Sequence, residues 1–331
     1  MNNKTMRKNI ALVCGGYTGE YEISIASAEQ IYKNLKDDYN VYKIIINRKE
    51  WFFENGNDKI HIDKNDFSLT LDGNKICFDF AFIIVHGTPG ENGLLQGYFD
   101  MLSIPYNTCS ALVSAITFDK QICNAVVKQM NIVKVANNTS IHKDDKEISL
   151  DEILSKVKLP VFVKPSQGGS SLATFKVTKQ EDLLSCIEKA FEVDNKVLVE
   201  EYIKGREFSC GVMMIDNKVT ALPVAEICPK TDFFDWQAKY QGLSEEKVPA
   251  PIDETMTTYI QRLTEKIYKN LNCRGVCRID YIWDTDKKEL YFLEINTTPG
   301  QSEESIVPKQ VRCMNKDVQW LYKMQITNVL K

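Results

Sequence analysis

The sequence has no excess of basic residues, no long apolar run and no pair of cysteines at the CxxC spacing of a metal site. Its 331 residues include 41 Lys and Arg against 45 Asp and Glu, a net charge of −4, so we expect no nucleic-acid partner. No apolar run approaches the roughly 18 residues of a membrane span. The polar start MNNKTMRKN leads into a predicted strand rather than a secretion signal. We therefore expect a cytoplasmic protein without a membrane partner.

The ten cysteines are scattered, and no two of them have the CxxC spacing that is typical of zinc sites. Cys273 and Cys277 come closest to it, but the strand pattern places Cys277 on an apolar face. We therefore expect no zinc site and interpret the cysteines as reduced, mostly buried thiols.

The first third of the chain alternates strand and helix patterns. Strand signals at NIALVCGG, NVYKIII and FDFAFIIVHG are separated by helical patterns, one of which spaces apolar residues at Ala28, Ile31, Tyr32 and Leu35. This order predicts a parallel, doubly wound α/β domain over residues 1–119. Such sheets bind ligands at the carboxyl ends of their strands, where this chain has GGYTGEYE and HGTPGENG. The GxGxxG spacing is absent, so we expect no nicotinamide dinucleotide site.

Two α+β units are expected to follow, over residues 120–201 and 202–331. In the first, two short β segments in LPVFVKPSQGGSSLATFKV enclose a Gly/Ser loop, and an amphipathic helix follows at about 180–192. In the second, antiparallel hairpins accompany one long helix at about 253–271. A chain of this length suits two or three domains.

The segment RIDYIWDTDKKELYFLEIN, residues 278–296, predicts a β-hairpin with its turn centred on Lys287. The expected pairs on the apolar face are Ile279 with Ile295, Tyr281 with Leu293, and Trp283 with Tyr291. The expected pairs on the polar face are Asp280 with Glu294, and Arg278 with Asn296.

The pairing of Asp280 with Glu294 is unfavourable unless a cation lies between them. Like charges about 5 Å apart repel by roughly 3 kcal/mol at an effective dielectric constant of about 20. Hard oxygen ligands without His or Cys favour magnesium or manganese, and magnesium is typically shared with substrate phosphates. The alternative is a solvated face on which Arg278 compensates the acids, but its pairing with Asn296 argues against this. The repulsion predicts that Asp280→Asn would leave the metal-free fold as stable or slightly more stable.

The segment KPSQGGSS is a candidate phosphate loop. Lys164 ends a predicted strand, and Gly168 and Gly169 would let backbone N–H groups approach an anion closely. A Gly/Ser hairpin turn would look much the same, and the Walker A spacing is absent. Together with a magnesium face, the loop predicts a nucleoside triphosphate site.

Eight motifs together are specific to one family. In chain order they are GGYTGEYEIS, HGTPGENGLLQGYFDMLSIPY, FDK, VKPSQGGSS, VEEYIKGREF, FDWQAKY, RID and LEINTTPGQSEESIVP. With these motifs the chain closely resembles the D-alanine:D-alanine ligases, which are ATP-grasp carboxylate–amine ligases, almost from end to end. The resemblance implies an ATP-grasp fold in which the two α+β units clamp ATP. It also implies two magnesium ions, for which manganese can substitute, and a homodimer.

The resemblance assigns ATP and metal contacts to named positions. It implies phosphate contacts from Lys120, Lys164 and Lys239, adenine contacts from Glu200 and the backbone of Glu201 and Ile203, and ribose contacts from Glu207. The implied magnesium ligands are Asp280, Glu294 and Asn296.

The resemblance also assigns substrate contacts and catalytic groups. Glu22 would bind the ammonium of the first D-alanine, His86 would lie near its pocket, and Ser305 with Ile306 would hold the carboxylate of the second. Arg278 and the backbone N–H of Gly300 would form an oxyanion hole, and Tyr240 would anchor a lid by hydrogen bonds to Ser170 and Glu22.

The implied reaction joins two D-alanines through an acyl phosphate, for peptidoglycan synthesis. Glu22 as a helix cap and His86 as a strand-end histidine remain alternative interpretations. A related ligase that takes D-lactate or D-serine as its second substrate also remains open, and so does a nucleotide-binding regulator without turnover. The chain departs from many relatives at Gly168, where they carry an acidic residue, and at Tyr21, where they carry arginine.

Overall fold

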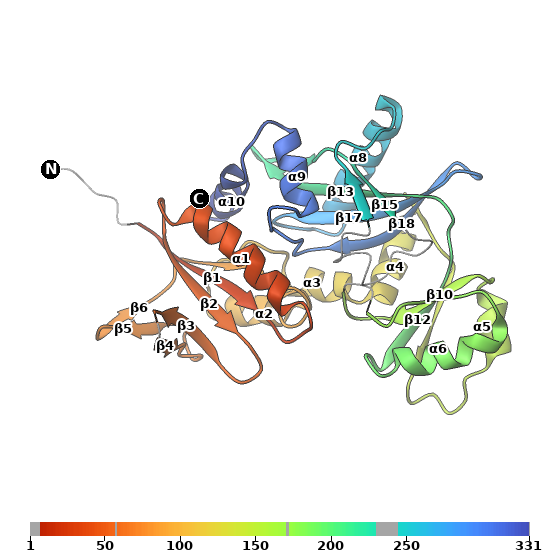
Figure 1. Cartoon of the computed structure of the whole chain (residues 1–331), viewed down its shortest axis with the longest axis horizontal. Helices are drawn as coiled ribbons and strands as arrows, with labels where there is room; N and C mark the ends of the chain where they lie inside the picture. Colours follow the sequence, from red (N-terminus) through yellow and green to blue (C-terminus); the bar gives the residue numbers. More distant parts are fainter. Residues whose placement is uncertain (1–6, 57, 170–171, 230–243, 331) are drawn as a thin grey trace.

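The computed structural model of the chain describes residues 7–56, 58–169, 172–229 and 244–330. A five-stranded sheet from the first part of the chain lies at one end of the molecule (Figure 1). A four-stranded sheet lies at the opposite end, and a seven-stranded sheet lies between them. No helix in the described ranges is both long enough and apolar enough to cross a bilayer.

The five-stranded sheet has the order β4-β3-β2-β1-β7. The elements of this part are β1 (Asn9–Gly15), α1 (Tyr21–Leu35), β2 (Asn40–Ile46), β3 (Trp51–Asn55), β4 (Asp58–His61), β5 (Leu69–Leu71), β6 (Asn74–Ile76), β7 (Phe80–Ile83), α2 (Leu94–Met101) and α3 (Ala111–Phe118). β1 pairs in parallel with β2 and β7, which confirms the parallel α/β arrangement expected from the sequence. β3 and β4 add an antiparallel edge that the sequence did not predict. Ala28, Ile31 and Leu35 of α1 are buried, as the helical spacing predicted.

The four-stranded sheet has the order β11-β10-β12-β9. The elements of this part are α4 (Lys120–Gln129), β8 (Lys134–Val135), β9 (Asn138–His142), α5 (Leu150–Lys156), β10 (Val161–Pro165), β11 (Phe175–Val177), the 3-10 turn η1 (Gln180–Asp182), α6 (Leu183–Ala190) and β12 (Lys196–Glu201). The amphipathic helix expected at about 180–192 is present as η1 and α6, and α6 buries Leu183 and Ile187. β10 lies between β11 and β12, so the loop that joins β10 to β11 leaves the sheet beside β12.

The seven-stranded sheet has the order β16-β15-β13-β17-β18-β8, with β14 paired to β13. The elements of this part are β13 (Arg206–Ile215), β14 (Lys218–Ala221), β15 (Ala225–Pro229), β16 (Ser244–Lys247), α8 (Glu254–Asn270), β17 (Cys277–Asp284), β18 (Glu289–Asn296), α9 (Ile306–Cys313) and α10 (Val318–Thr327). The long helix expected at about 253–271 is α8. Asp253 caps it by accepting a hydrogen bond of 2.8 Å from the Met256 N–H.

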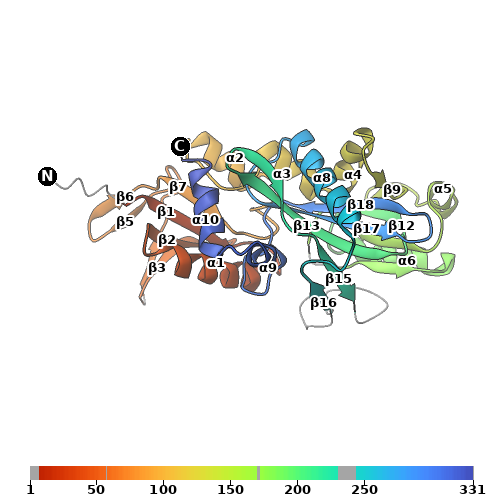
Figure 2. The ribbon, with the colours of Figure 1, turned by 90° about the horizontal axis from the view of Figure 1, so that it is seen from above.

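Contacts between the parts cross the boundaries expected at residues 119 and 201. β8 pairs in parallel with β18 and so belongs to the middle sheet. At the other end of the chain, α9 and α10 lie beside α1 (Figure 2). Tyr322 of α10 shares a buried cluster with Ile10 and Phe82 of the first sheet. The chain end therefore packs against the N-terminal sheet, and the three domain ranges stay predictions.

The hairpin of β17 and β18 has the expected register from Arg278 to Asp280 only, and this includes the predicted pair of Ile279 with Ile295. Arg278 pairs with Asn296, and Asp280 pairs with Glu294, as predicted. Beyond Asp280 a β-bulge shifts the register by one residue, so Tyr281 pairs with Phe292 and not with Leu293. The predicted pair of Trp283 with Tyr291 is likewise wrong, because Trp283 pairs with Leu290.

Candidate functional site

A cavity of about 790 Å³ is lined by residues of the four-stranded and seven-stranded sheets and by loops that follow strands of the five-stranded sheet. Its volume lies within the range of small-molecule sites. The predicted site residues that line it are Lys120, Lys164, Ile203, Glu207 and Glu294. The loop after β1 contributes Thr18 and Glu20 to the lining. Thr88 of the second predicted ligand loop also lines it. The cavity therefore joins the predicted phosphate loop, the end of β18 and both predicted ligand loops of the first sheet.

Lys164 is held at the end of β10 by a buried acid on the neighbouring strand. Its side chain is 10% exposed, and its ammonium lies 3.2 Å from Glu200 Oε2. Asn124 of α4 donates a hydrogen bond of 3.4 Å to the same carboxylate oxygen. These contacts fix a cation at the cavity wall, where it can attract a phosphate group.

The phosphate loop is also bonded to the start of α4. Asp119 caps this helix, and its carboxylate accepts hydrogen bonds from Ser166 Oγ at 2.8 Å and from Lys196 Nζ at 2.6 Å. Burial opposes ionisation of Asp119, but these donors lower its pKa. Lys120 donates from Nζ to the Gly168 carbonyl at 2.5 Å. Asp119 was not among the residues predicted from the sequence, although an acid before a predicted helix is a capping signal.

Glu20, for which no role was predicted from the sequence, lies directly against the phosphate loop. A β-carbon on Gly169 would lie 2.7 Å from a Glu20 carboxylate oxygen, so the glycine makes room for the acid. Glu22 was the expected acidic contact, but it is exposed in the first turn of α1 and is absent from the cavity lining. Of these two acids, only Glu20 lines the cavity, and the contact predicted for Glu22 stays a prediction.

The polar face of the hairpin carries an ion pair between Arg278 and Asp280, which was not expected from the sequence. Arg278 donates from Nη2 to Asp280 Oδ2 at 2.7 Å and from Nε to Oδ1 at 3.0 Å. Ser209 Oγ donates to Asp280 Oδ1 at 2.6 Å. Burial opposes the charge of Arg278, but the neighbouring Asp280 raises its pKa. Arg278 therefore compensates Asp280 although its backbone pairs with Asn296.

The donor set on this face fits a hard divalent cation. Asp280 and Glu294 face each other across β17 and β18, and Asn296 lies one pair further along the same face. All three offer oxygen ligands, which suit magnesium. The Asn296 side-chain oxygen already accepts a hydrogen bond of 2.9 Å from the Thr298 N–H, which orients it.

The turn after β18 brings Gly300 close to the start of α9. A β-carbon on Gly300 would lie 2.9 Å from Ser305 Oγ, and this hydroxyl lies 2.7 Å from Ser302 Oγ. Ser305 precedes α9, and its side chain makes no capping hydrogen bond to the helix. The Ser305 hydroxyl and the first N–H groups of α9 can together receive a carboxylate.

Known proteins resemble the chain over nearly its whole length. The family profiles described as D-ala D-ala ligase N-terminus and D-ala D-ala ligase C-terminus match residues 9–109 and 124–327. The D-alanine–D-alanine ligase of Porphyromonas gingivalis is 42% identical over 93% of this chain and 94% of its own length. That of Phocaeicola vulgatus is 43% identical over 95% of this chain and 96% of its own. The chain belongs to the D-alanine–D-alanine ligase family.

Two solved structures share the fold of this family member. The VanG D-Ala:D-Ser ligase from Enterococcus faecalis superposes with a TM-score of 0.86 at 30% identity, covering 97% of this chain and 99% of that one. The D-alanyl-alanine synthetase A from Vibrio cholerae superposes with a TM-score of 0.88 at 26% identity, covering 98% and 99%. The expected ATP-grasp fold is confirmed.

The remaining positions implied by the resemblance to D-alanine–D-alanine ligases are distributed as follows. The Glu201 side chain accepts hydrogen bonds from Asn137 and from the Lys158 N–H, and the Glu201 backbone N–H donates to the Asn137 carbonyl at 2.9 Å. Three of these positions lie on the hairpin, namely Arg278, Asp280 and Asn296. Gly300 lies in the turn that follows, and Ser305 and Ile306 lie at the start of α9. Ser170, Lys239 and Tyr240 lie outside the described residues.

His86 is buried in the loop after β7 of this ligase-family chain. Burial lowers its pKa, and its Nε2 has no hydrogen-bond partner among the described residues. Five residues later, Glu91 accepts a hydrogen bond of 2.6 Å from the Gly87 N–H. Burial raises the pKa of Glu91 to about 8, and the charge of Glu20 acts in the same direction. Glu91 was not among the residues predicted from the sequence, although Glu91 lies within the HGTPGENG motif.

The raised pKa of Glu91 predicts a pH-dependent stability. Between about pH 4.5 and 8 the folded chain holds a proton on Glu91 that the unfolded chain has lost. The free energy of unfolding therefore falls as pH rises, by at most about 1.4 kcal/mol per pH unit from this group. Glu91→Gln should remove this slope. The melting temperature of the variant, measured relative to that of the unmodified chain, should therefore rise between pH 5 and pH 8. Parallel melting profiles over this range would contradict the assignment.

Proposed function

We propose that the chain ligates two D-alanines to D-alanyl-D-alanine, with conversion of ATP to ADP and phosphate, for peptidoglycan synthesis in the cytoplasm. The observation that carries this proposal is that one cavity is lined by Lys120, Lys164 and Glu294 together with Glu20 of the loop after β1. The lysines suit a triphosphate, and the acid of this loop suits an ammonium group beside it.

The proposed ATP site lies against the four-stranded sheet. Lys120 and Lys164 would contact phosphate oxygens, and the glycine loop that follows β10 would supply backbone N–H groups. Ile203 and Glu207 line the cavity beyond β12, on the side proposed for adenine and ribose. Asp280, Glu294 and Asn296 would hold two magnesium ions, which offset the charge of the phosphoryl group when bound.

The proposed reaction has two steps in one closed site. A carboxylate oxygen of the first D-alanine attacks the γ-phosphorus of ATP, ADP leaves, and an acyl phosphate remains. The neutral amine of the second D-alanine then attacks the acyl carbon, and phosphate leaves as the amide forms. Arg278 and the Gly300 N–H would stabilise the oxyanion of the tetrahedral intermediate. Water must be kept out, because it would hydrolyse the acyl phosphate.

Glu20 is proposed to bind the ammonium of the first D-alanine. Glu20→Gln should lower kcat/KM for the first D-alanine by about 10- to 100-fold, because a charge-assisted hydrogen bond is lost. Glu22→Gln is the matched control, since it alters an exposed acid two residues away and should leave turnover unchanged. Steady-state kinetics of both variants decide between the two acids. Loss of activity in Glu22→Gln alone would contradict the choice of Glu20.

The acceptor is the part of the proposal that most needs a direct experiment. Phosphate release should be measured with ATP, magnesium and single or paired D-alanine, D-serine, D-lactate and L-alanine, with products identified by mass. We expect D-alanine alone to support full turnover and to give the dipeptide as the main product. Faster turnover with a D-alanine and D-serine pair, or with D-lactate, would favour the related ligases instead. No phosphate release with any substrate would favour a nucleotide-binding regulator.

The assembly is proposed to be a homodimer, as the resemblance implies. Sedimentation at micromolar concentration measures it directly. A monomer with full turnover would contradict the dimer while leaving the proposed reaction intact.

A further inference from the structure

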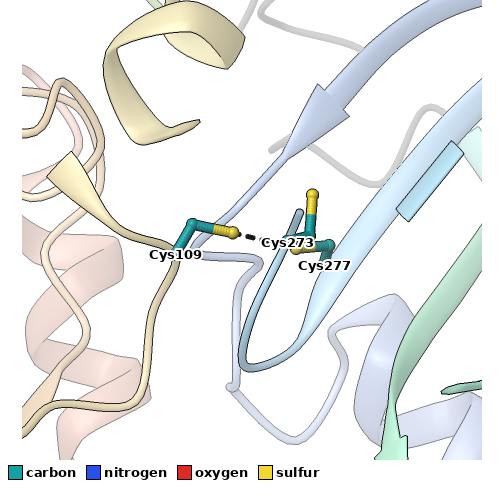
Figure 3. Close-up of side chains that lie close together, drawn as sticks. All are labelled: Cys109, Cys273 and Cys277. Carbon is teal, nitrogen blue, oxygen red and sulfur yellow. Dashed lines mark hydrogen bonds between the residues drawn. The ribbon is translucent and has the colours of Figure 1, made fainter. Parts of the chain in front are cut away.

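Three buried cysteines from distant parts of the chain meet outside the cavity (Figure 3). Cys109 lies in the loop before α3, Cys273 follows α8, and Cys277 begins β17. Their sulfur atoms all lie within 4.8 Å of one another, and the sulfurs of Cys109 and Cys277 are 3.6 Å apart. The sequence predicted no metal site here because it lacks CxxC, but the structure supplies the third thiol from a residue more than 160 positions earlier.

The spacing of the sulfurs suits one ion bound at their centre. Three thiolates at about 2.3 Å from a metal lie about 4 Å apart when they surround it in a plane. The observed separations bracket this value, so little movement of the side chains is needed. Among the described residues no fourth Cys, His, Asp or Glu joins the group. A three-coordinate ion therefore fits better than tetrahedral zinc, and monovalent copper is the thiophilic ion with that preference.

The loop between Cys273 and Cys277 is built to approach Cys109 closely. Gly275 has φ +68°, and a β-carbon on it would collide with the carbonyl oxygen of Asn107. The Arg274 N–H donates to Cys109 Sγ at 3.4 Å, as backbone N–H groups do to metal-bound thiolates.

A cationic side chain lies beside the segment that carries Cys109. The Arg274 guanidinium donates a hydrogen bond of 3.0 Å to the Tyr106 hydroxyl and lies over the Tyr106 ring. Tyr106 is three residues before Cys109 in the chain.

We propose that Cys109, Cys273 and Cys277 bind one thiophilic metal ion, best matched by monovalent copper, through three thiolates. Binding replaces three S–H bonds with three S–metal bonds and releases three protons, with no change in oxidation state. The bound ion would link the loop that leaves the N-terminal sheet to the start of β17. This site is separate from the proposed ligase chemistry, so either proposal can fail without the other.

The test uses the full-length chain with the exposed thiols Cys77 and Cys313 replaced by serine, which removes surface sites for copper. Under anaerobic reducing conditions, monovalent copper is titrated against a chromogenic chelator, and X-ray absorption counts the sulfur ligands. We expect one equivalent bound by three sulfurs, at least 100-fold weaker binding in Cys109→Ser, and a higher melting temperature with copper.

Cys123→Ser is the matched control, since Cys123 is buried on α4 but lies outside the cluster. It should bind copper as the parent does, and circular dichroism should show that both serine variants are folded. Equal copper affinity in the parent and in folded Cys109→Ser would overturn the proposal. So would a metal shell without three sulfurs, or no copper bound by the reduced parent. If Cys109→Ser does not fold, the sulfur count in the parent alone decides.

Discussion

Arg278→Ala is expected to lower kcat by about 10²- to 10³-fold while changing KM for either D-alanine much less. The guanidinium is held by two hydrogen bonds to Asp280, so it is oriented before the reaction begins. An oriented donor that acts on charge appearing only in the intermediate contributes to kcat rather than to ground-state binding.

Arg278→Lys tests the geometry as well as the charge. Lysine keeps the cation but cannot form the two-point contact with Asp280, so an intermediate loss of kcat is expected. Both variants are compared by steady-state kinetics over a full range of each substrate. A loss confined to KM would mean that Arg278 binds substrate and does not stabilise the intermediate.

Asp280→Asn is expected to lower magnesium-dependent ATP turnover by about 10²- to 10⁴-fold, because it would remove a charged ligand of the proposed metal site. It is also expected to lower the stability of the metal-free chain by about 2 kcal/mol, because Arg278 would remain buried without its partner. This second effect reverses the sequence-based expectation. The repulsion between Asp280 and Glu294 suggested that the substitution would not lower the stability of the metal-free chain, whereas the ion pair of Asp280 with Arg278 predicts that it will.

Asp284→Asn is the matched control for Asp280→Asn. Asp284 is a buried acid at the turn end of β17, where it accepts backbone hydrogen bonds from Asp286 and Lys287 and lies away from the cavity lining. It should retain full turnover. Thermal melts and turnover should be measured together on both variants. Full activity in Asp280→Asn would refute the metal assignment, and an unchanged melting temperature would refute the role of the ion pair.

The hairpin illustrates what a sequence pattern can predict and where it fails. Alternation of apolar and polar residues gave the correct pairs as far as Asp280 and Glu294, because both faces there have distinct chemistry. Tyr291, Phe292 and Leu293 are consecutive apolar residues, so alternation cannot reveal the bulge that follows. The contact of Arg278 with Asp280 was also missed, since a strand pattern fixes backbone pairs and not the direction of a long side chain.

The choice between Glu20 and Glu22 could not be made from composition or spacing. Both acids flank Tyr21, and either could have faced the ligand. The structure separates them because α1 begins at Tyr21, which leaves Glu20 in the loop that faces the cavity and Glu22 on the outer surface of the helix.

The cysteine cluster could not be predicted from the sequence for another reason. It depends on the packing of the segment before α3 against the loop after α8, which no local pattern encodes.

The most direct test of the proposed ligation follows one oxygen atom. The chain is incubated with ATP, magnesium and D-alanine whose carboxylate carries oxygen-18, and the phosphate and dipeptide are analysed by mass. If the carboxylate is phosphorylated and the amine then displaces phosphate, each phosphate should carry one labelled oxygen for every dipeptide formed. Unlabelled phosphate accompanying dipeptide would contradict the acyl phosphate route, and labelled oxygen in AMP would mean that adenylation takes its place.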